Sequence, residues 1–161
     1  SDLFINFAPN SIYDPAYCLR TTYKAMADTG LTPERIVFEV TETERITDMP
    51  HLLSILHEYR RHGFRIALDD LGAGYASLTL LESLRPHLVK LDMDLVRGVD
   101  SDRFKAALAA PLLTAARELG IDSVAEGVET EGEYIWLRDH GASLIQGFLF
   151  GRPSPAGGLL P

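Results

Sequence analysis

Short apolar runs that end in a polar or charged residue recur along the chain. Six such runs have the length and composition of β-strands, and an acid, an amide or a lysine lies at or near the end of each. The runs are residues 4–6, 36–39, 66–70, 88–92, 124–126 and 144–146. Their apolar residues are consecutive, which is typical of strands covered on both faces. The pattern therefore predicts six buried strands with polar side chains at their ends.

Stretches with helical spacing separate most of these runs. The first begins at Asp14-Pro15, an N-cap followed by a proline at the first helical position, and ends at Gly30. Pro111 lies inside the helical stretch at residues 101–120 and predicts that this helix is kinked or starts later, near Ala109. The other helical stretches extend over residues 52–63, 101–120 and 130–141, with Ser101 and Thr130 as expected N-caps. Strand and helix thus alternate along the chain.

This alternation is typical of parallel strands joined by crossover helices, and so of the α/β class. In a barrel of parallel strands, all carboxyl ends open onto one face, and that face holds the active site. A closed barrel of this kind has eight strands. The chain starts at Ser1, close to its first strand, so we expect a TIM-like (β/α) barrel that lacks its first strands. An open doubly wound sheet is the alternative.

Composition adds broad limits. A length of 161 residues with 46% hydrophobic residues suits one soluble domain over residues 1–161. The net charge of −8 gives no electrostatic reason to bind DNA, RNA or an anionic membrane. Cys18 is the single cysteine, which excludes an internal disulfide and fits a reducing compartment. We therefore expect a cytoplasmic domain without membrane contact.

Four carboxylates are expected at strand ends: Glu39, Asp69, Asp70 and Glu126. If they share one barrel mouth, each close pair repels by about 1–4 kcal/mol at effective dielectric constants of about 20–80. Protons or cations must offset that repulsion. Oxygen ligands favour hard cations such as Mg²⁺ or Mn²⁺. Two such ions that share a bridging aspartate can assist in-line attack on a phosphodiester.

Each candidate residue also has a structural explanation. Asp70 could cap a following helix, and Lys90 could form an ion pair with Asp92 on the same strand face. A lysine in a barrel mouth can also form a Schiff base, but nearby acids would keep it protonated and argue against that chemistry. Loop anchors or buried amides would explain the remaining candidates, which are Glu42, Glu129, Asn6 and Gln146.

Six segments together resemble the EAL domain, the bacterial cyclic di-GMP phosphodiesterase module. They are residues 6–8, 38–42, 69–78, 89–92, 125–130 and 146–148, and they follow the order of the family from one end of the chain to the other. The Glu-Ala-Leu motif itself is not in the sequence, and we expect it upstream of Ser1. By that interpretation, residues 1–161 are an N-terminally truncated EAL domain. We expect the parent protein to be active and this fragment alone to be impaired or inactive.

The resemblance implies hydrolysis of cyclic di-GMP to linear pGpG with two Mg²⁺ or Mn²⁺ ions. It implies that Asn6, Glu39 and Asp69 hold one ion. Asp69 would bridge to a second ion held by Asp70 and Glu126. These implied ligands are the same carboxylates that the strand ends suggest, with one amide added.

The resemblance also implies roles for five further residues. Lys90 would position or activate the attacking water, supported by Asp92. Gln146 would lie on the substrate or water side of the site, with Glu129 behind the ligands. Glu42 would anchor the mobile loop after Asp70, which couples metal binding to dimerisation in the family. We therefore expect a homodimer, fused to sensory or GGDEF-type domains.

Three other functions compete with this hypothesis. A catalytically impaired cyclic di-GMP receptor is the main alternative, although every ligand expected within these residues is present. A purely structural interaction domain would have no reason to keep four carboxylates at strand ends. A Schiff-base aldolase that uses Lys90 is the best alternative enzyme.

Overall fold

The computed structural model describes residues 2–7, 15–41, 48–72 and 77–152. Glu42, one of the predicted site residues, lies outside these ranges. The chain forms two compact units, Ser1–Lys90 and Leu91–Pro161. None of the helices in the described ranges is long and apolar enough to cross a membrane.

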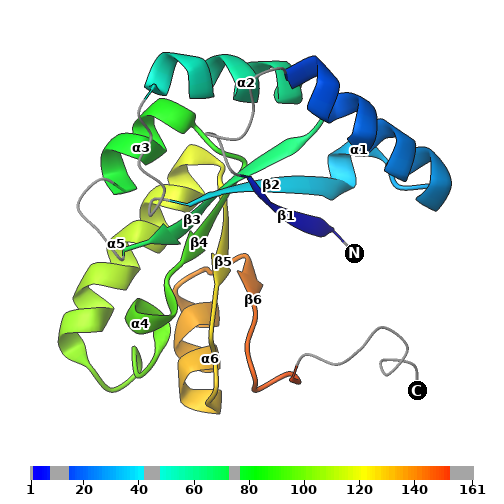
Figure 1. Cartoon of the computed structure of the whole chain (residues 1–161). Coiled ribbons are helices and arrows are strands. Elements are labelled where there is room, and N and C mark those ends of the chain that lie inside the picture. Colours follow the sequence, from blue (N-terminus) through cyan, green and yellow to red (C-terminus); the bar gives the residue numbers. More distant parts are fainter. Residues whose placement is uncertain (1, 8–14, 42–47, 73–76, 153–161) are drawn as a thin grey trace. The chain divides into compact units, whose positions relative to one another are not determined.

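The first unit alternates strands with helices in chain order (Figure 1). Its elements are β1 (Leu3–Phe7), α1 (Pro15–Thr29), the short 3-10 helix η2 (Pro33–Arg35), β2 (Ile36–Thr41), α2 (Met49–Arg61), β3 (Arg65–Leu71), α3 (Ser77–Leu84) and β4 (Leu88–Leu91), of which Leu91 begins the second unit. β1 pairs with β2, and β2 with β3, both in parallel. Parallel pairing brings the carboxyl ends of these strands to the same edge.

An aromatic cluster forms part of the core of this unit. The rings of Phe38 and Tyr59 lie 4.8 Å apart between centroids, and Phe7 and Phe64 pack edge-on against this pair. All four side chains are at most 5% exposed. Tyr59 comes from α2 and the others from the strands or the residue before β3, so the cluster joins α2 to the sheet. Large buried aromatic side chains contribute strongly to core stability.

The second unit repeats the alternation on a smaller scale. It contains α4 (Met93–Val96), α5 (Arg103–Leu119), β5 (Asp122–Ala125), α6 (Glu131–Asp139) and β6 (Leu144–Ile145). β5 and β6 pair in parallel, with Val124 opposite Leu144 and Ala125 opposite Ile145. An apolar core that includes Leu113 of α5 and Leu137 of α6 packs these elements together.

These elements confirm the α/β class and the positions of all six predicted strands, but β1 and β6 are mostly exposed or half-buried and not covered on both faces. The described residues contain fewer strands than the eight of a closed barrel, which agrees with the predicted incomplete barrel. The short helix α4 was not predicted, and α3 was anticipated only as a helix that Asp70 could cap, because neither is long enough to show helical periodicity.

The predicted start of the long helix was wrong. Asp102, not Ser101, is the N-cap of α5, and its carboxylate accepts hydrogen bonds from the N–H groups of Phe104 and Lys105. The helix also includes Pro111 instead of starting near Ala109. Pro111 lies on the exposed side of the helix, where water can satisfy the carbonyl that lost its N–H partner.

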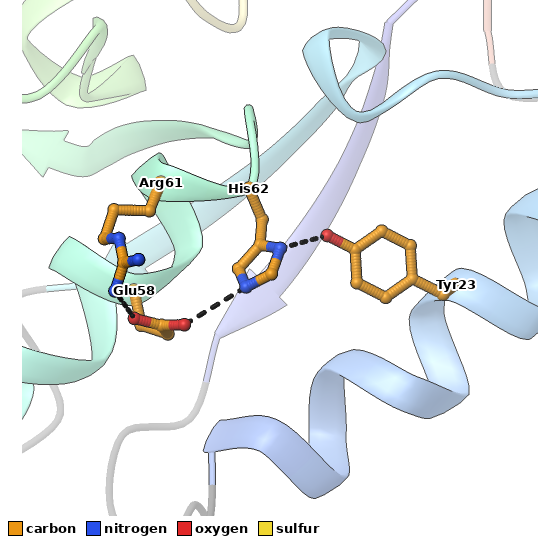
Figure 2. A network of polar contacts seen from close by, with 4 residues as sticks. All are labelled: Tyr23, Glu58, Arg61 and His62. Carbon is orange, nitrogen blue, oxygen red and sulfur yellow. Dashed lines mark hydrogen bonds and ion pairs between the residues drawn. The ribbon is translucent and has the colours of Figure 1, made fainter.

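A polar network joins α1 to the end of α2 (Figure 2). The hydroxyl of Tyr23 lies 2.6 Å from Nδ1 of His62, and Nε2 of His62 lies 3.1 Å from Glu58, which also pairs with Arg61. Because the Glu58 carboxylate only accepts, Nε2 of His62 is assigned as the donor to Glu58, and Nδ1 as the acceptor of the Tyr23 hydroxyl. Burial and the charge of Glu58 raise the pKa of Tyr23, so its hydroxyl stays protonated. This network precedes β3 and is structural.

His87 is expected to make stability depend on pH. The ring nitrogen Nδ1 of His87 accepts the backbone N–H of Ile66 at 3.0 Å. The backbone N–H of His87 donates to the carbonyl of Ile66 at 2.8 Å. Partial burial and the charges of Arg60 and Arg65 lower the pKa of His87. The folded state therefore binds the proton less tightly than the unfolded state, so this contribution is present above a pH of about 6.5 and is lost as the pH falls.

The matched variant is His87→Asn, which keeps an acceptor near the Nδ1 position and does not titrate. Urea unfolding should show that the free energy of unfolding falls more between pH 7.5 and pH 5.5 in the wild type than in His87→Asn. Equal losses in the two proteins would show that the His87 contact contributes nothing to the pH dependence.

Candidate active site

Two carboxylates and one lysine meet in the first unit. Glu39 of β2, Asp69 of β3 and Lys90 of β4 are each 7–8% exposed. Nζ of Lys90 lies 2.6 Å from Oε1 of Glu39 and 3.1 Å from Oδ1 of Asp69. All three belong to the residues that the sequence predicted for one site, and the structure confirms that they lie together.

The register of the strands explains how these side chains meet. Glu39 lies opposite Ala67 of β3, and Asp69 is two residues farther along β3, so Asp69 points to the same face as Ala67. The carboxylates of Glu39 and Asp69 thus leave neighbouring strands on one face. Lys90 reaches both from the next strand in the chain, and its ammonium group offsets their repulsion.

Asp70 and Asn6 extend this group of polar side chains. Asp70 has a φ of 60°, a left-handed conformation that Asp adopts more readily than most residues, and its N–H donates to Oδ1 of Asp69 at 3.0 Å. This turn of the backbone fixes the orientation of the Asp69 carboxylate. Asn6 of β1 lies opposite Glu39 and is exposed.

The donor atoms of this group are of the kind that a hard divalent cation prefers. Glu39, Asp69 and Asn6 offer carboxylate and amide oxygens from neighbouring strands, and such oxygens are the ligands that Mg²⁺ and Mn²⁺ prefer. In the described parts of the chain, no three His, Cys, Asp or Glu side chains are gathered closely enough to hold a metal ion. Lys90 supplies the positive charge between Glu39 and Asp69.

A pocket of about 200 Å³ lies in the second unit. It is lined by Met93, Arg97, Glu126, Gly127, Glu129, Gln146, Gly147 and Phe148. Three of these residues, Glu126, Glu129 and Gln146, were predicted as site residues from the sequence, and the structure brings them together. The pocket carries both acidic and basic side chains, an amide and an aromatic ring.

Backbone hydrogen bonds hold the segment around Glu126 in place. Gln146 donates its N–H to the carbonyl of Ala125 at 2.9 Å and accepts the N–H of Val128 at 3.1 Å. These two bonds bracket Glu126 and Gly127. Gly127 has a φ of 71°, which other residues adopt only with strain. The segment therefore turns sharply after β5 and presents the half-buried Glu126 to the pocket.

Sequence reasoning missed Arg97, and it assigned Asp92 either to the support of Lys90 in catalysis or to an ion pair with Lys90. Arg97 follows α4 and forms an ion pair of 2.7 Å with Glu129 across the pocket lining. Asp92 is the N-cap of α4 and accepts the N–H of Asp94 at 2.8 Å. A catalytic role for Asp92 stays a prediction. The short helix α4 gave no periodic signal that could have pointed to Arg97.

Gly147 is expected to tolerate no side chain. A Cβ atom at this position would lie 2.0 Å from the carbonyl oxygen and 2.3 Å from the nitrogen of Val128, both backbone atoms. Gly147→Ala should therefore lower the free energy of unfolding by about 1–3 kcal/mol or more. Thermal or urea unfolding measures the change.

Gly132 in α6 provides the matched control. Its added Cβ would lie 2.3 Å from Oδ2 of Asp100, which can rotate away because it is the end of an exposed side chain. Since alanine favours a helix over glycine, Gly132→Ala should leave stability unchanged or raise it by up to about 1 kcal/mol. A similar loss in both variants would contradict the argument from backbone contact.

Comparison with known proteins adds a family and several relatives. A model of the EAL domain family matches residues 1–153. "Bifunctional diguanylate cyclase/cyclic di-GMP phosphodiesterase MucR" of Pseudomonas aeruginosa is 37% identical over 131 residues, which is 81% of this chain and 19% of MucR. The chain spans about a fifth of the length of MucR and of two other curated relatives.

Solved structures of two similar proteins contain the cyclic dinucleotide. A standalone EAL protein from Vibrio cholerae O395 in its c-di-GMP-bound form is 40% identical with a TM-score of 0.88, over 96% of this chain and 65% of that one. BlrP1 of Klebsiella pneumoniae, in a manganese and c-di-GMP complex, is 40% identical with a TM-score of 0.86, over 94% and 39% of the two chains.

Proposed function

Because the chain belongs to the EAL domain family, we propose that the protein hydrolyses cyclic di-GMP to linear pGpG with the help of divalent cations. The buried contact of Glu39 and Asp69 with Lys90 is the observation that carries this proposal. Two carboxylates with only 7–8% exposure are costly to bury beside each other. A site that binds cations and activates water gives a reason for that cost.

Five residues are assigned to the cations. Asn6, Glu39 and Asp69 would hold one ion, and Asp69, Asp70 and Glu126 would supply oxygens to the second. When bound, the ions neutralise charge on the phosphodiester and lower the pKa of bound water. The left-handed φ of Asp70, close to the end of β3, supports this assignment, because it departs from the regular strand geometry that sends successive side chains to opposite faces.

Lys90 and Asp92 are assigned to the attacking water. A water oxygen adds to phosphorus, the bond from phosphorus to one ribose 3′ oxygen breaks, and that oxygen takes a proton. The Lys90 ammonium can donate a hydrogen bond that holds the water, while the carboxylates it contacts keep its charge in place. Asp92 supports Lys90 from two residues farther along the chain.

The pocket of the second unit is assigned to the substrate side of the reaction. Gln146 can hydrogen-bond to a phosphate, a water or a base edge, and Arg97 carries the positive charge that suits a phosphate. Glu129 holds Arg97 through their ion pair of 2.7 Å. Glu42 is assigned to the loop after Asp70 by the family resemblance alone.

The wider setting of the protein is also proposed. Phe104 and Leu108 lie one turn apart on α5 and are 78% and 63% exposed, which supports a homodimer contact through this helix. The length of the relatives supports fusion to sensory or GGDEF-type domains. The single cysteine and the proposed second-messenger substrate support a cytoplasmic location.

Chromatography of cyclic di-GMP after incubation with the full-length protein tests the function. With Mn²⁺, the substrate peak should be replaced by pGpG. Excess EDTA should stop the reaction, and renewed Mn²⁺ should restore it, because the assigned oxygen ligands favour hard cations. A parallel incubation with cyclic di-AMP tests base specificity.

The outcomes separate the competing functions. Cyclic di-GMP that is bound but not hydrolysed would place the protein among the receptors. Hydrolysis that persists in EDTA would overturn the metal assignments. Neither binding nor hydrolysis would overturn the proposed function. Trapping of a carbonyl substrate by borohydride would identify the Schiff-base alternative at Lys90.

A further inference from the structure

Glu133 of α6 is a buried carboxylate with an unusual set of partners. It is 4% exposed, and three backbone N–H groups donate to it. Burial raises its pKa, but the hydrogen bonds from Gly98, Glu129 and Thr130 outweigh this effect and hold the pKa below its ordinary value. Glu133 is therefore ionised at neutral pH.

Part of this arrangement is a capping box at the start of α6. The N–H of Thr130 donates to Oε2 of Glu133 at 3.0 Å, and Oγ1 of Thr130 accepts the N–H of Glu133 at 3.2 Å. A capping box needs only these two reciprocal bonds. Glu133 makes two further contacts that the cap does not explain.

The two further contacts join separate loops. Oε1 of Glu133 accepts the N–H of Gly98 at 2.7 Å, and Oε2 accepts the N–H of Glu129 at 2.8 Å. Gly98 directly follows Arg97, and Glu129 belongs to the segment that starts at Glu126. One carboxylate thus connects the loop after α4 to the loop after β5.

Both loops line the pocket of about 200 Å³, to which they contribute Arg97, Glu126 and Glu129. The ion pair between Arg97 and Glu129 joins the same two loops on their solvent-exposed side. An exposed ion pair holds two loops only weakly. The buried carboxylate of Glu133 is the stronger of the two connections, because charge-assisted hydrogen bonds with little exposure to water are worth more.

We propose that Glu133 is a positioning residue for the reaction, which sets the place of Glu126 and Arg97 by joining the loops that carry them. This inference rests on the proposed phosphodiesterase function. Glu133 itself need not touch the substrate or a cation. Removal of partners that orient metal ligands commonly lowers metal affinity or activity about 10–100-fold.

Three variants of the full-length protein separate positioning from helix capping. Glu133→Ala removes the cap and both loop contacts. Thr130→Ala removes one capping bond and keeps the contacts of Glu133 with Gly98 and Glu129. Glu133→Gln keeps an oxygen for one loop but turns an NH₂ group toward the N–H donors of the other.

We expect Glu133→Ala to lower kcat and Mn²⁺ affinity about 10–100-fold, with a smaller change in KM for cyclic di-GMP. Glu133→Gln should lie between this variant and the wild type. Thr130→Ala should lower Tm but keep kcat near the wild-type value. Hydrogen exchange should speed up at Gly98 and Glu129 in Glu133→Ala and not in Thr130→Ala.

Two results would overturn the positioning role of Glu133. Equal kcat in folded Glu133→Ala and Thr130→Ala would reduce Glu133 to a helix cap and overturn the inference. If Glu133→Ala does not fold, the same comparison is made between Glu133→Gln and Thr130→Ala. A wild-type protein that does not hydrolyse cyclic di-GMP would instead overturn the proposed function, and this inference with it.

Discussion

Replacing Lys90 with methionine is expected to remove activity and to destabilise the cation-free protein. Methionine has a similar length but no charge, so the buried carboxylates of Glu39 and Asp69 would face each other without compensation. Removal of one partner from a buried charged group typically costs about 3–5 kcal/mol. Loss of a group that positions or activates water typically lowers the rate about 10²–10⁴-fold.

Mn²⁺ should reverse the two effects of Lys90→Met to different extents. A cation can replace the lost charge, so urea unfolding in Mn²⁺ should recover much of the stability. Activity should not recover, because the water is no longer held by Lys90. Lys24→Met is the matched control, since Lys24 is exposed on α1. Wild-type stability of Lys90→Met in EDTA would show that the carboxylates do not need this lysine.

Replacing Glu126 with glutamine is expected to lower hydrolysis about 10²–10⁴-fold. Glutamine keeps the shape of the side chain and loses the negative charge that the proposed second cation would require. Charge stabilisation by a bound cation is worth several kcal/mol in the transition state, which corresponds to these factors. Product formation at saturating cyclic di-GMP and the affinity for Mn²⁺, followed by calorimetry, should both fall.

Glu131→Gln controls for the loss of one negative charge near the pocket segment. Glu131 is exposed in the first turn of α6 and is not among the lining residues of the pocket. Its variant should keep both activity and Mn²⁺ affinity. If Glu126→Gln also kept both, Glu126 would be a residue of the substrate pocket and not a cation ligand.

Much of the fold was readable from local patterns. The six strands could be placed because each contains consecutive apolar residues, a pattern that burial on both faces demands in β2, β3 and β4. The capped and periodic helices α1, α2, α5 and α6 could be placed for a similar reason. The helices α3 and α4 have only 8 and 4 residues, so their stability comes from packing and capping that no local pattern reveals.

The candidate site likewise combines residues that can be recognised in the sequence with contacts that depend on the folded structure. That Glu39, Asp69 and Lys90 lie at strand ends was determined by the sequence, because a charged residue that interrupts an apolar run is visible there. The contacts of 2.6 and 3.1 Å with Lys90 were decided by strand register, which depends on residues far apart in the chain.

Glu133 shows most clearly which contacts local sequence patterns do not reveal. Local sequence signals identified Thr130 as the N-cap of α6, and the carboxylate of Glu133, which completes the capping box in the structure, lies within the same helical turn. Only the tertiary structure decided that the same carboxylate also binds Gly98, which lies 35 residues away. Local patterns reflect interactions within a few residues, whereas a contact between loops arises when packing of the whole unit brings them together.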